Sequence, residues 1–241
     1  MAQLYFIWKG EKSDTKGITV VEYPPIIHPK ERGQQIVIPG RNGDVTLLEG
    51  ESGTVFDPYT RTVDCYALAG QNDAEIAAWL RGTGELVIGD RPDRVYKAAV
   101  SENFEISRAL HGKYREFSIP FYIQPLGGKY PPETNITVTS SGRSIYNPGD
   151  VPSMPKVTVN GSGAVSLTIG GTAVGLSLTT GTIVLDWESG VVTNAAGTQS
   201  LAAFVTGGPQ RIPVGSSAVS WRSVNNGSVS SVVIEPRWRW F

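Results

Sequence analysis

The 241-residue sequence predicts a mainly β protein of two domains. Short segments that alternate apolar with small polar residues fill the second half, and only one segment has the period of a helix. Between the halves, the stretch GGKYPPETN at 127–135 clusters Gly and Pro, which resist both helix and central strand. We therefore expect one domain over 1–128 and a second over 129–241.

The first domain is predicted to carry a single short amphipathic helix. Asn72 and Glu75 have the spacing of a capping box, and Ile76, Trp79 and Leu80 then fall on one helical face. We interpret Trp79 as a core anchor and the following Gly-Thr-Gly as the end of the helix. Strands are expected at 85–88, 95–106 and 116–123, and a loop at 111–112.

The second domain is predicted to be an all-β sandwich or jelly roll, because its candidate strands are short and closely spaced. These strands are expected at 156–160, 165–169, 175–178, 182–188, 190–193, 218–223 and 228–235.

Charge and composition narrow the classes of function. The 21 Lys and Arg residues nearly balance the 22 Asp and Glu residues, so the formal charge is −1 and no global attraction to DNA or an anionic membrane exists. Cys65 is the single cysteine, which excludes an internal disulfide, and we interpret it as a small apolar residue within a strand. With no signal peptide and no long apolar run, we expect a soluble protein made in a cytoplasm, without membrane insertion.

A search for catalytic chemistry yields no candidate. The two histidines, His28 and His111, lie far in sequence from any catalytic-looking Ser or Cys, and no G-x-S-x-G motif is present. One cysteine with two histidines is too few for a structural zinc site. Asp186 and Glu188 share one strand face, which we interpret as solvated rather than as a glycosidase pair. We therefore expect no catalytic residue, no metal ligands and no cofactor.

The stretch IVIPGRNGDVTLLEG at 36–50 places charged residues at the tip of a predicted hairpin. Asn42 and Gly43 form the dipeptide that best tolerates a type I′ turn. Arg41 and Asp44 flank this pair and project from the tip. Taken alone, the two charges either solubilise the tip or pair with a neighbouring subunit.

The order of several segments resembles the siphophage distal tail protein (Dit) family. The segments FIWKGEKSDTKGITVVEYP, IPGRNGDV, AAWLRGTGELVIGDRPDRVYKAAV and REFSIPFYIQP together resemble its N-terminal domain. The final VVIEPRWRWF resembles the closing strand of its C-terminal domain. The resemblance rests on the order and separation of these segments, because no one of them is a specific motif.

This resemblance implies a structural virion protein at the tip of a long non-contractile phage or prophage tail. The N-terminal domain would be a β-sandwich or split barrel with one helix, forming a homohexameric ring below the tail tube through which DNA passes. The C-terminal domain would be a galectin-like sandwich that serves as a peripheral docking platform. The implied partners are the major tail tube protein, the tail hub or tail-associated lysin-type protein, and receptor-binding or baseplate proteins.

Within such a ring, Arg41, Asn42, Gly43 and Asp44 would form an inter-subunit or tube-contacting hairpin. An enzymatic role, such as that of a tail lysin, is not favoured because no catalytic residues are found.

The alternative function is a carbohydrate-binding β-sandwich module. Trp187 and Trp221 are then the candidates for stacking on a sugar, although the second domain holds no histidine to accompany them.

Near the end of the chain, Trp238 and Trp240 alternate with two arginines, which puts both indoles on one strand face. We interpret them as a core-facing pair opposite an exposed basic stripe formed by Arg237 and Arg239.

Overall fold

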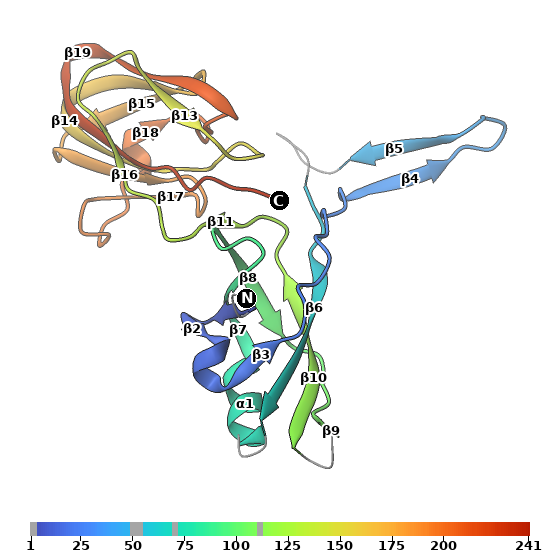
Figure 1. The fold of residues 1–241 in the computed structure, drawn as a ribbon. Coiled ribbons are helices and arrows are strands. Elements are labelled where there is room, and N and C mark those ends of the chain that lie inside the picture. The colour runs from blue at the N-terminus through green and yellow to red at the C-terminus, as the bar shows by residue number, and fades with distance from the viewer. Residues whose placement is uncertain (1–3, 49–54, 69–71, 110–112) are drawn as a thin grey trace. The chain divides into compact units, whose positions relative to one another are not determined.

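The computed structural model describes the chain except for residues 1–3, 49–54, 69–71 and 110–112 (Figure 1). The chain divides into two compact units, residues 1–130 together with Phe241, and residues 131–240. Strands dominate both units, and the described residues contain one α-helix. The prediction of a mainly β protein is therefore confirmed.

Unit 1 (residues 1–130 and Phe241) is built on a nine-stranded antiparallel sheet that curls into a half-barrel. Its main strands run in the order β2-β1-β7-β8-β10-β6-β3, with β11 on β8 and β9 on β10. The bounds are β1 Phe6–Trp8, β2 Glu11–Lys12, β3 Ile18–Val20, β6 Tyr59–Leu68, β7 Gly82–Ile88, β8 Arg94–Val100, β9 Ser107–Ala109, β10 Tyr114–Ile123 and β11 Gly128–Lys129. A 3-10 helix occupies Ser13–Lys16.

The helix α1 (Asp73–Leu80) covers the core of unit 1, as predicted. Its N-cap Asn72 accepts a hydrogen bond from the Ala74 amide at 3.0 Å. Ile76 and Leu80 are buried, and the Trp79 ring stacks on Phe6 with 5.8 Å between centroids. The predicted cap and core anchor are therefore confirmed.

Two predicted strands of unit 1 have different bounds in the structure. The strand predicted at 95–106 ends at Val100, because the polar sequence Ser-Glu-Asn that follows is exposed and irregular. The strand predicted at 85–88 starts earlier, at Gly82, directly after the helix. The predicted loop at His111 and Gly112 lies outside the described residues.

Unit 2 (residues 131–240) contains an eight-stranded antiparallel sheet whose two longest strands, β14 and β19, pair along most of their length. The strand order is β12-β19-β14-β15-β18, with β13 on β19, β16 on β14 and β17 on β16. The bounds are β12 Ile136–Val138, β13 Arg143–Asn147, β14 Lys156–Ile169, β15 Thr172–Leu178, β16 Thr182–Asp186, β17 Val191–Thr193, β18 Val205–Thr206 and β19 Gly215–Glu235. A 3-10 helix occupies Ala202–Phe204.

Four predicted strands of unit 2 merge into two long ones. The strands expected at 156–160 and 165–169 join in β14, and those expected at 218–223 and 228–235 join in β19. Glycines that suggested turns instead permit β-bulges, since the register shifts at Asn160/Gly161 and again at Ala164/Val165. Trp238 and Trp240 are 6% exposed and belong to the core, as predicted.

Gly161 sits where the backbones of β14 and β19 approach closely, and this generates the first prediction. A Cβ added at Gly161 would clash with the Ser228 carbonyl oxygen, whereas one added at Gly208 would meet open space. Gly161→Ala is expected to destabilise unit 2 by about 1–3 kcal/mol through overpacking. Differential scanning calorimetry should show the loss for Gly161→Ala and none for the control Gly208→Ala. Equal midpoints for both variants would contradict this close approach.

Candidate functional site

The strands β4 (Gly33–Val37) and β5 (Asp44–Leu48) form a two-stranded antiparallel hairpin that pairs with no other described strand. We call residues 33–48 the arm (Figure 1). The root of the arm is held by a bridge between Glu31 and Phe56 and by a bond from the Arg32 amide to the Val55 carbonyl at 2.7 Å. An ion pair from Arg32 Nε to Asp57 Oδ1, also 2.7 Å long, strengthens the root.

The arm tip is wider than the predicted two-residue turn. The Arg41 amide donates to the Ile38 carbonyl at 3.1 Å, and Gly40 has a φ of 82°. Pro39 and Gly40 therefore form a type II turn of their own, which moves the loop away from a type I′ turn on Asn42 and Gly43. Gly43 still needs its positive φ of 77°. All four predicted tip residues, 41–44, are exposed.

Exposed apolar side chains are concentrated in and before the arm. Of the fourteen large hydrophobic residues that are exposed in the described part of the chain, half lie within 21–47: Val21, Ile26, Ile27, Ile36, Val37, Ile38 and Leu47. Clustering of this kind marks an interaction surface, whereas scattered apolar residues do not.

The arm has one apolar face and one mixed face. Ile36 lies opposite Val45, and Leu47 follows Val45 by two residues on the same face. Val37 lies opposite Asp44, so the Asp44 carboxylate is on the other face. An isolated two-stranded hairpin is marginal in water, and no strand among the described residues pairs with this arm. The described side chains of β4 are all exposed.

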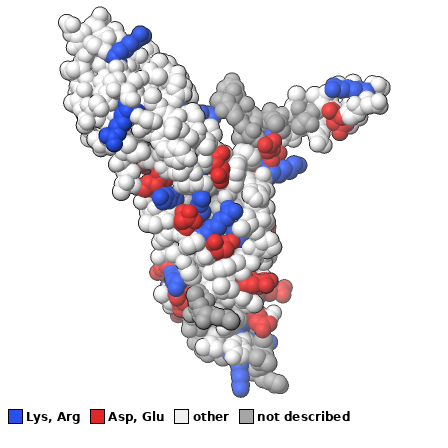
Figure 2. All heavy atoms as spheres, turned by 45° about the horizontal axis from the view of Figure 1, so that its top comes forward, with Lys and Arg blue, Asp and Glu red and all other residues white. Residues whose placement is uncertain are grey.

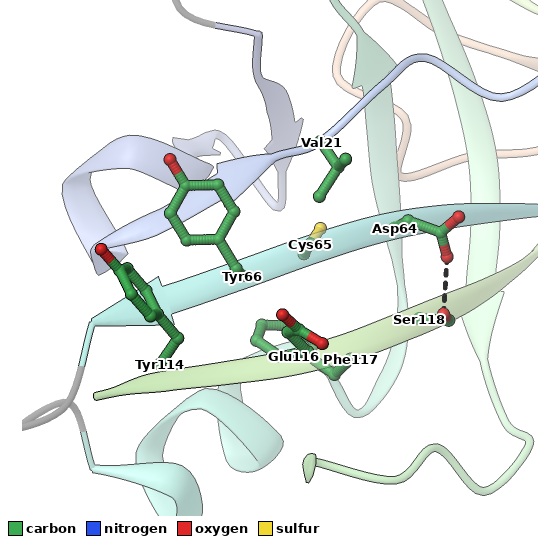
Figure 3. A pocket seen from close by; sticks show the side chains of 8 residues that line it. All are labelled: Val21, Asp64, Cys65, Tyr66, Tyr114, Glu116, Phe117 and Ser118. Carbon is green, nitrogen blue, oxygen red and sulfur yellow. Dashed lines mark hydrogen bonds between the residues drawn. The ribbon is translucent and has the colours of Figure 1, made fainter. Parts of the chain in front are cut away.

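A second surface is formed by β6 and β10, which pair over ten residues. We call their solvent side the outer face; it carries Thr62, Asp64, Tyr66 and Leu68 from β6 and Tyr114, Glu116, Ser118 and Tyr122 from β10. A cavity of about 730 Å³ lies on this face (Figure 3). Sequence reasoning missed this surface, although the alternation in TVDCYAL indicates a strand with one wet face.

The outer face combines two carboxylates with apolar surface. Ser118 Oγ donates to Asp64 Oδ1 at 2.5 Å, and Glu116 projects beside this pair (Figure 3). The Tyr66 and Tyr114 rings meet edge to face, 5.9 Å apart. None of the residues that define this face is a Lys or Arg. Beneath it, burial raises the pKa of the Cys65 thiol to about 12, which fits the interpretation of Cys65 as a small apolar residue.

In unit 2, five charged side chains form an ion-pair cluster. Arg237 donates to Asp186 at 2.8 Å, to Glu235 at 3.0 Å and to Glu188 at 3.2 Å, while Arg239 binds Glu188 at 2.8 Å. Glu188 is exposed and Asp186 is only partly buried, so both remain in contact with solvent, but they are paired with arginines. The interpretation of Arg237 and Arg239 as an exposed basic stripe was wrong, because both are half-buried and ion-paired.

The physical reason for the cluster lies in β14. In the backbone register, Lys156 lies opposite Asp186 of β16 on one side and opposite Glu235 of β19 on the other. The last residues of β16 and β19 therefore flank the same residue of β14. Partial burial by itself raises the pKa of Asp186, but hydrogen bonds from Arg237 and from two backbone amides outweigh it and lower the pKa. A carboxyl group held ionised in this way is unsuited to donate a proton.

The two candidate sugar-stacking residues do not lie together. Trp221 pairs with Leu167 near one end of β14, and the Trp187 amide donates to the Pro155 carbonyl just before the other end. Both indoles are half-buried and pack against the core of unit 2.

Of the two histidines, His28 is exposed and His111 lies outside the described residues. Across the described part of the chain, no three or more His, Cys, Asp or Glu side chains are grouped to hold a metal ion. No helix there is long and apolar enough to span a membrane.

The fold of this chain is similar to that of a solved phage protein. The chain is similar to the Dit protein of SPP1 (gp 19.1), described as a paradigm of the hub adsorption apparatus in phages that infect Gram-positive bacteria. The identity is 15%, the TM-score is 0.74, and the match covers 97% of this chain and 98% of that one. The resemblance to the distal tail protein family is therefore confirmed at the level of the fold.

Two structures of the phage P2 baseplate in its activated conformation, one with Ca and one with Sr, are more distant. Each is 7% identical, with TM-scores of 0.44 and 0.42, and the matches cover 97% and 93% of this chain and 98% and 99% of theirs. No protein-family model and no curated protein sequence matches the chain.

The ion-pair cluster makes the stability of unit 2 depend on pH. A carboxyl group with a lowered folded-state pKa stabilises the fold above its unfolded pKa of about 3.9, and this contribution is lost as the pH falls through the folded pKa. We expect the midpoint of thermal unfolding to fall more steeply below about pH 4 in the native chain than in Asp186→Asn. Asp44→Asn, which alters an exposed carboxylate at the arm tip, is the control and should keep the native slope.

Proposed function

We propose that the chain is a structural protein of a long non-contractile phage or prophage tail. In this role it forms a hexameric ring at the distal end of the tail tube and connects the tube to the tail hub or baseplate. The observation that supports this most is a fold shared with SPP1 Dit over 97% of the chain. The exposed apolar arm supports it independently, because such a surface requires a partner.

The arm tip, residues 41–44, is proposed to contact the neighbouring subunit or the major tail tube protein. A six-membered ring repeats one heterologous contact, in which a projection on each subunit meets a different surface on the next. The arm is such a projection, with a root fixed by backbone pairing and an Arg32–Asp57 ion pair.

DNA is proposed to pass through the ring without specific binding. The net charge of the chain is −1, and Figure 2 shows both signs of charge interspersed on one face of the molecule. A basic lining would bind phosphates and hinder passage. A titration of the protein with duplex DNA at physiological ionic strength should therefore show no micromolar or tighter binding. Such binding would contradict a role as a DNA conduit.

Unit 2 is proposed to be a galectin-like peripheral platform for the tail hub, a tail-associated lysin-type protein, or receptor-binding and baseplate proteins. The alternative of a carbohydrate-binding module lacks a supporting observation, since Trp187 and Trp221 lie at opposite ends of β14. The proposed role is structural and non-enzymatic, and it places the protein in the virion at the tail tip.

The mass of the purified protein in solution tests the ring directly. Six chains of 25.9 kDa give about 155 kDa, and light scattering should find this species, with a central hole in negative-stain images. If only monomer is found, the measurement is repeated with tube protein and with hub protein added as templates. A chain that stays monomeric with both partners present would overturn the ring.

Deletion of the arm tests whether the arm is needed for assembly but not for folding. Replacing residues 34–47 by a short Gly-Ser link should change the free energy of unfolding by less than about 0.5 kcal/mol, because the described side chains of β4 are all exposed. The same deletion should abolish the ring in light scattering. A ring that survives the deletion would show that the arm is not an assembly element.

A further inference from the structure

We propose that the arm of one copy docks on the outer face of β6 and β10 of the next copy, with Arg41 beside Asp64 and Glu116. This rests on the proposed function, because it requires the chain to assemble with itself. The proposal goes beyond the proposed function because it identifies the outer face as the surface on which the arm docks. The similarity of fold does not identify that surface.

The exposed large hydrophobic residues of the described part of unit 1 fall into three groups. Val21, Ile26 and Ile27 precede the arm, and Ile36, Val37, Ile38 and Leu47 lie on it. The third group is Leu68 and Tyr122. Both belong to the outer face, one on each of its two strands. The apolar face of the arm and the outer face are thus two surfaces that one subunit leaves uncovered, and pairing them between subunits covers both.

The shape of the outer face suits a hairpin tip. The cavity in Figure 3 is open, and its walls include Val21 at one side and the Tyr66–Tyr114 pair at the other. Tyrosine rings with a free hydroxyl accept both apolar and polar contacts, which is typical of interface residues.

Charge complementarity identifies the occupant. The cavity contains Asp64 and Glu116 and no Lys or Arg, and neither carboxylate has an ion pair among the described residues. At the arm tip, Arg41 is exposed and likewise has no ion pair there. A guanidinium group forms directed bonds with carboxylates, which a partly shielded cavity strengthens.

The acidic neighbour of Arg41, Asp44, lies on the face of the arm opposite its apolar face. Asp44 shares a face with Val37, opposite the apolar face of Ile36 and Val45. When that apolar face lies against the sheet, Asp44 points away from the carboxylates of the cavity. The arm therefore docks without bringing like charges together.

Cross-linking two single variants tests the contact. Asn42→Cys places a thiol on the tip, and Ser118→Cys places one in the cavity; each variant is purified alone, then mixed and treated with a short bismaleimide. The native Cys65 is 2% exposed and does not compete. The control replaces Ser118→Cys by Ser101→Cys, an exposed serine outside the outer face.

The expected result is a mixed dimer with Ser118→Cys, at least about tenfold more abundant than with Ser101→Cys, because docking raises the local thiol concentration. Equal yields for the two partners would overturn the docking. If the yields are equal while light scattering finds the ring, only the docking surface is wrong and the proposed function stands. A cross-link confined within single chains of the double variant Asn42→Cys/Ser118→Cys would also overturn it.

Charge reversal tests the pairing of Arg41. Arg41→Glu should raise the concentration at which assemblies dissociate by about tenfold, and Glu116→Arg in the same chain should restore most of the loss, since coupled sites are non-additive. Asp44→Lys is the matched control and should show no coupling to Glu116→Arg. Equal coupling for Arg41 and Asp44, or none for either, would contradict the proposed pair.

Discussion

The central feature of the structure is an arm whose apolar face is not covered by any of the residues that the structure describes. The long strands of the two main sheets bury many of their side chains in a core, but the described side chains of β4 are exposed throughout. A hairpin of this kind loses conformational entropy on ordering and gains little burial in return. The arm would therefore be stabilised by a second surface, and the proposed ring would supply one from a neighbouring subunit.

The arm can act as a projection only because unit 1 holds the segment that leads to it. Arg61 is 4% exposed, and its Nη2 donates to the Pro24 carbonyl at 2.6 Å and to Asp90 Oδ2 at 2.7 Å. The buried guanidinium group of Arg61 thus links Pro24, in the segment before the arm, to the first half of β6. Removing one partner of such a pair leaves an uncompensated buried charge, so this contact is costly to break.

The sequence predicted the features that depend on neighbouring residues and missed those that depend on sheet pairing. The cap at Asn72 and the core positions of Trp238 and Trp240 follow from local spacing. The contact between Asp186 and Arg237 could not be predicted, because it arises from two strands that flank β14. The alternation of residues in β6 indicates a strand with one exposed side. Only the pairing of β6 with β10, which the sequence did not reveal, brings the carboxylates of Asp64 and Glu116 onto one surface.

Amide hydrogen exchange tests the central claim most directly, that assembly completes the arm. It is measured on the backbone amides of 33–37 and 44–48, in the isolated chain and in the assembly formed alone or with tube and hub proteins. The account predicts fast exchange in the isolated chain and strong protection in the assembly, together with protection along the outer face. Arm amides that are equally protected in both states would contradict it.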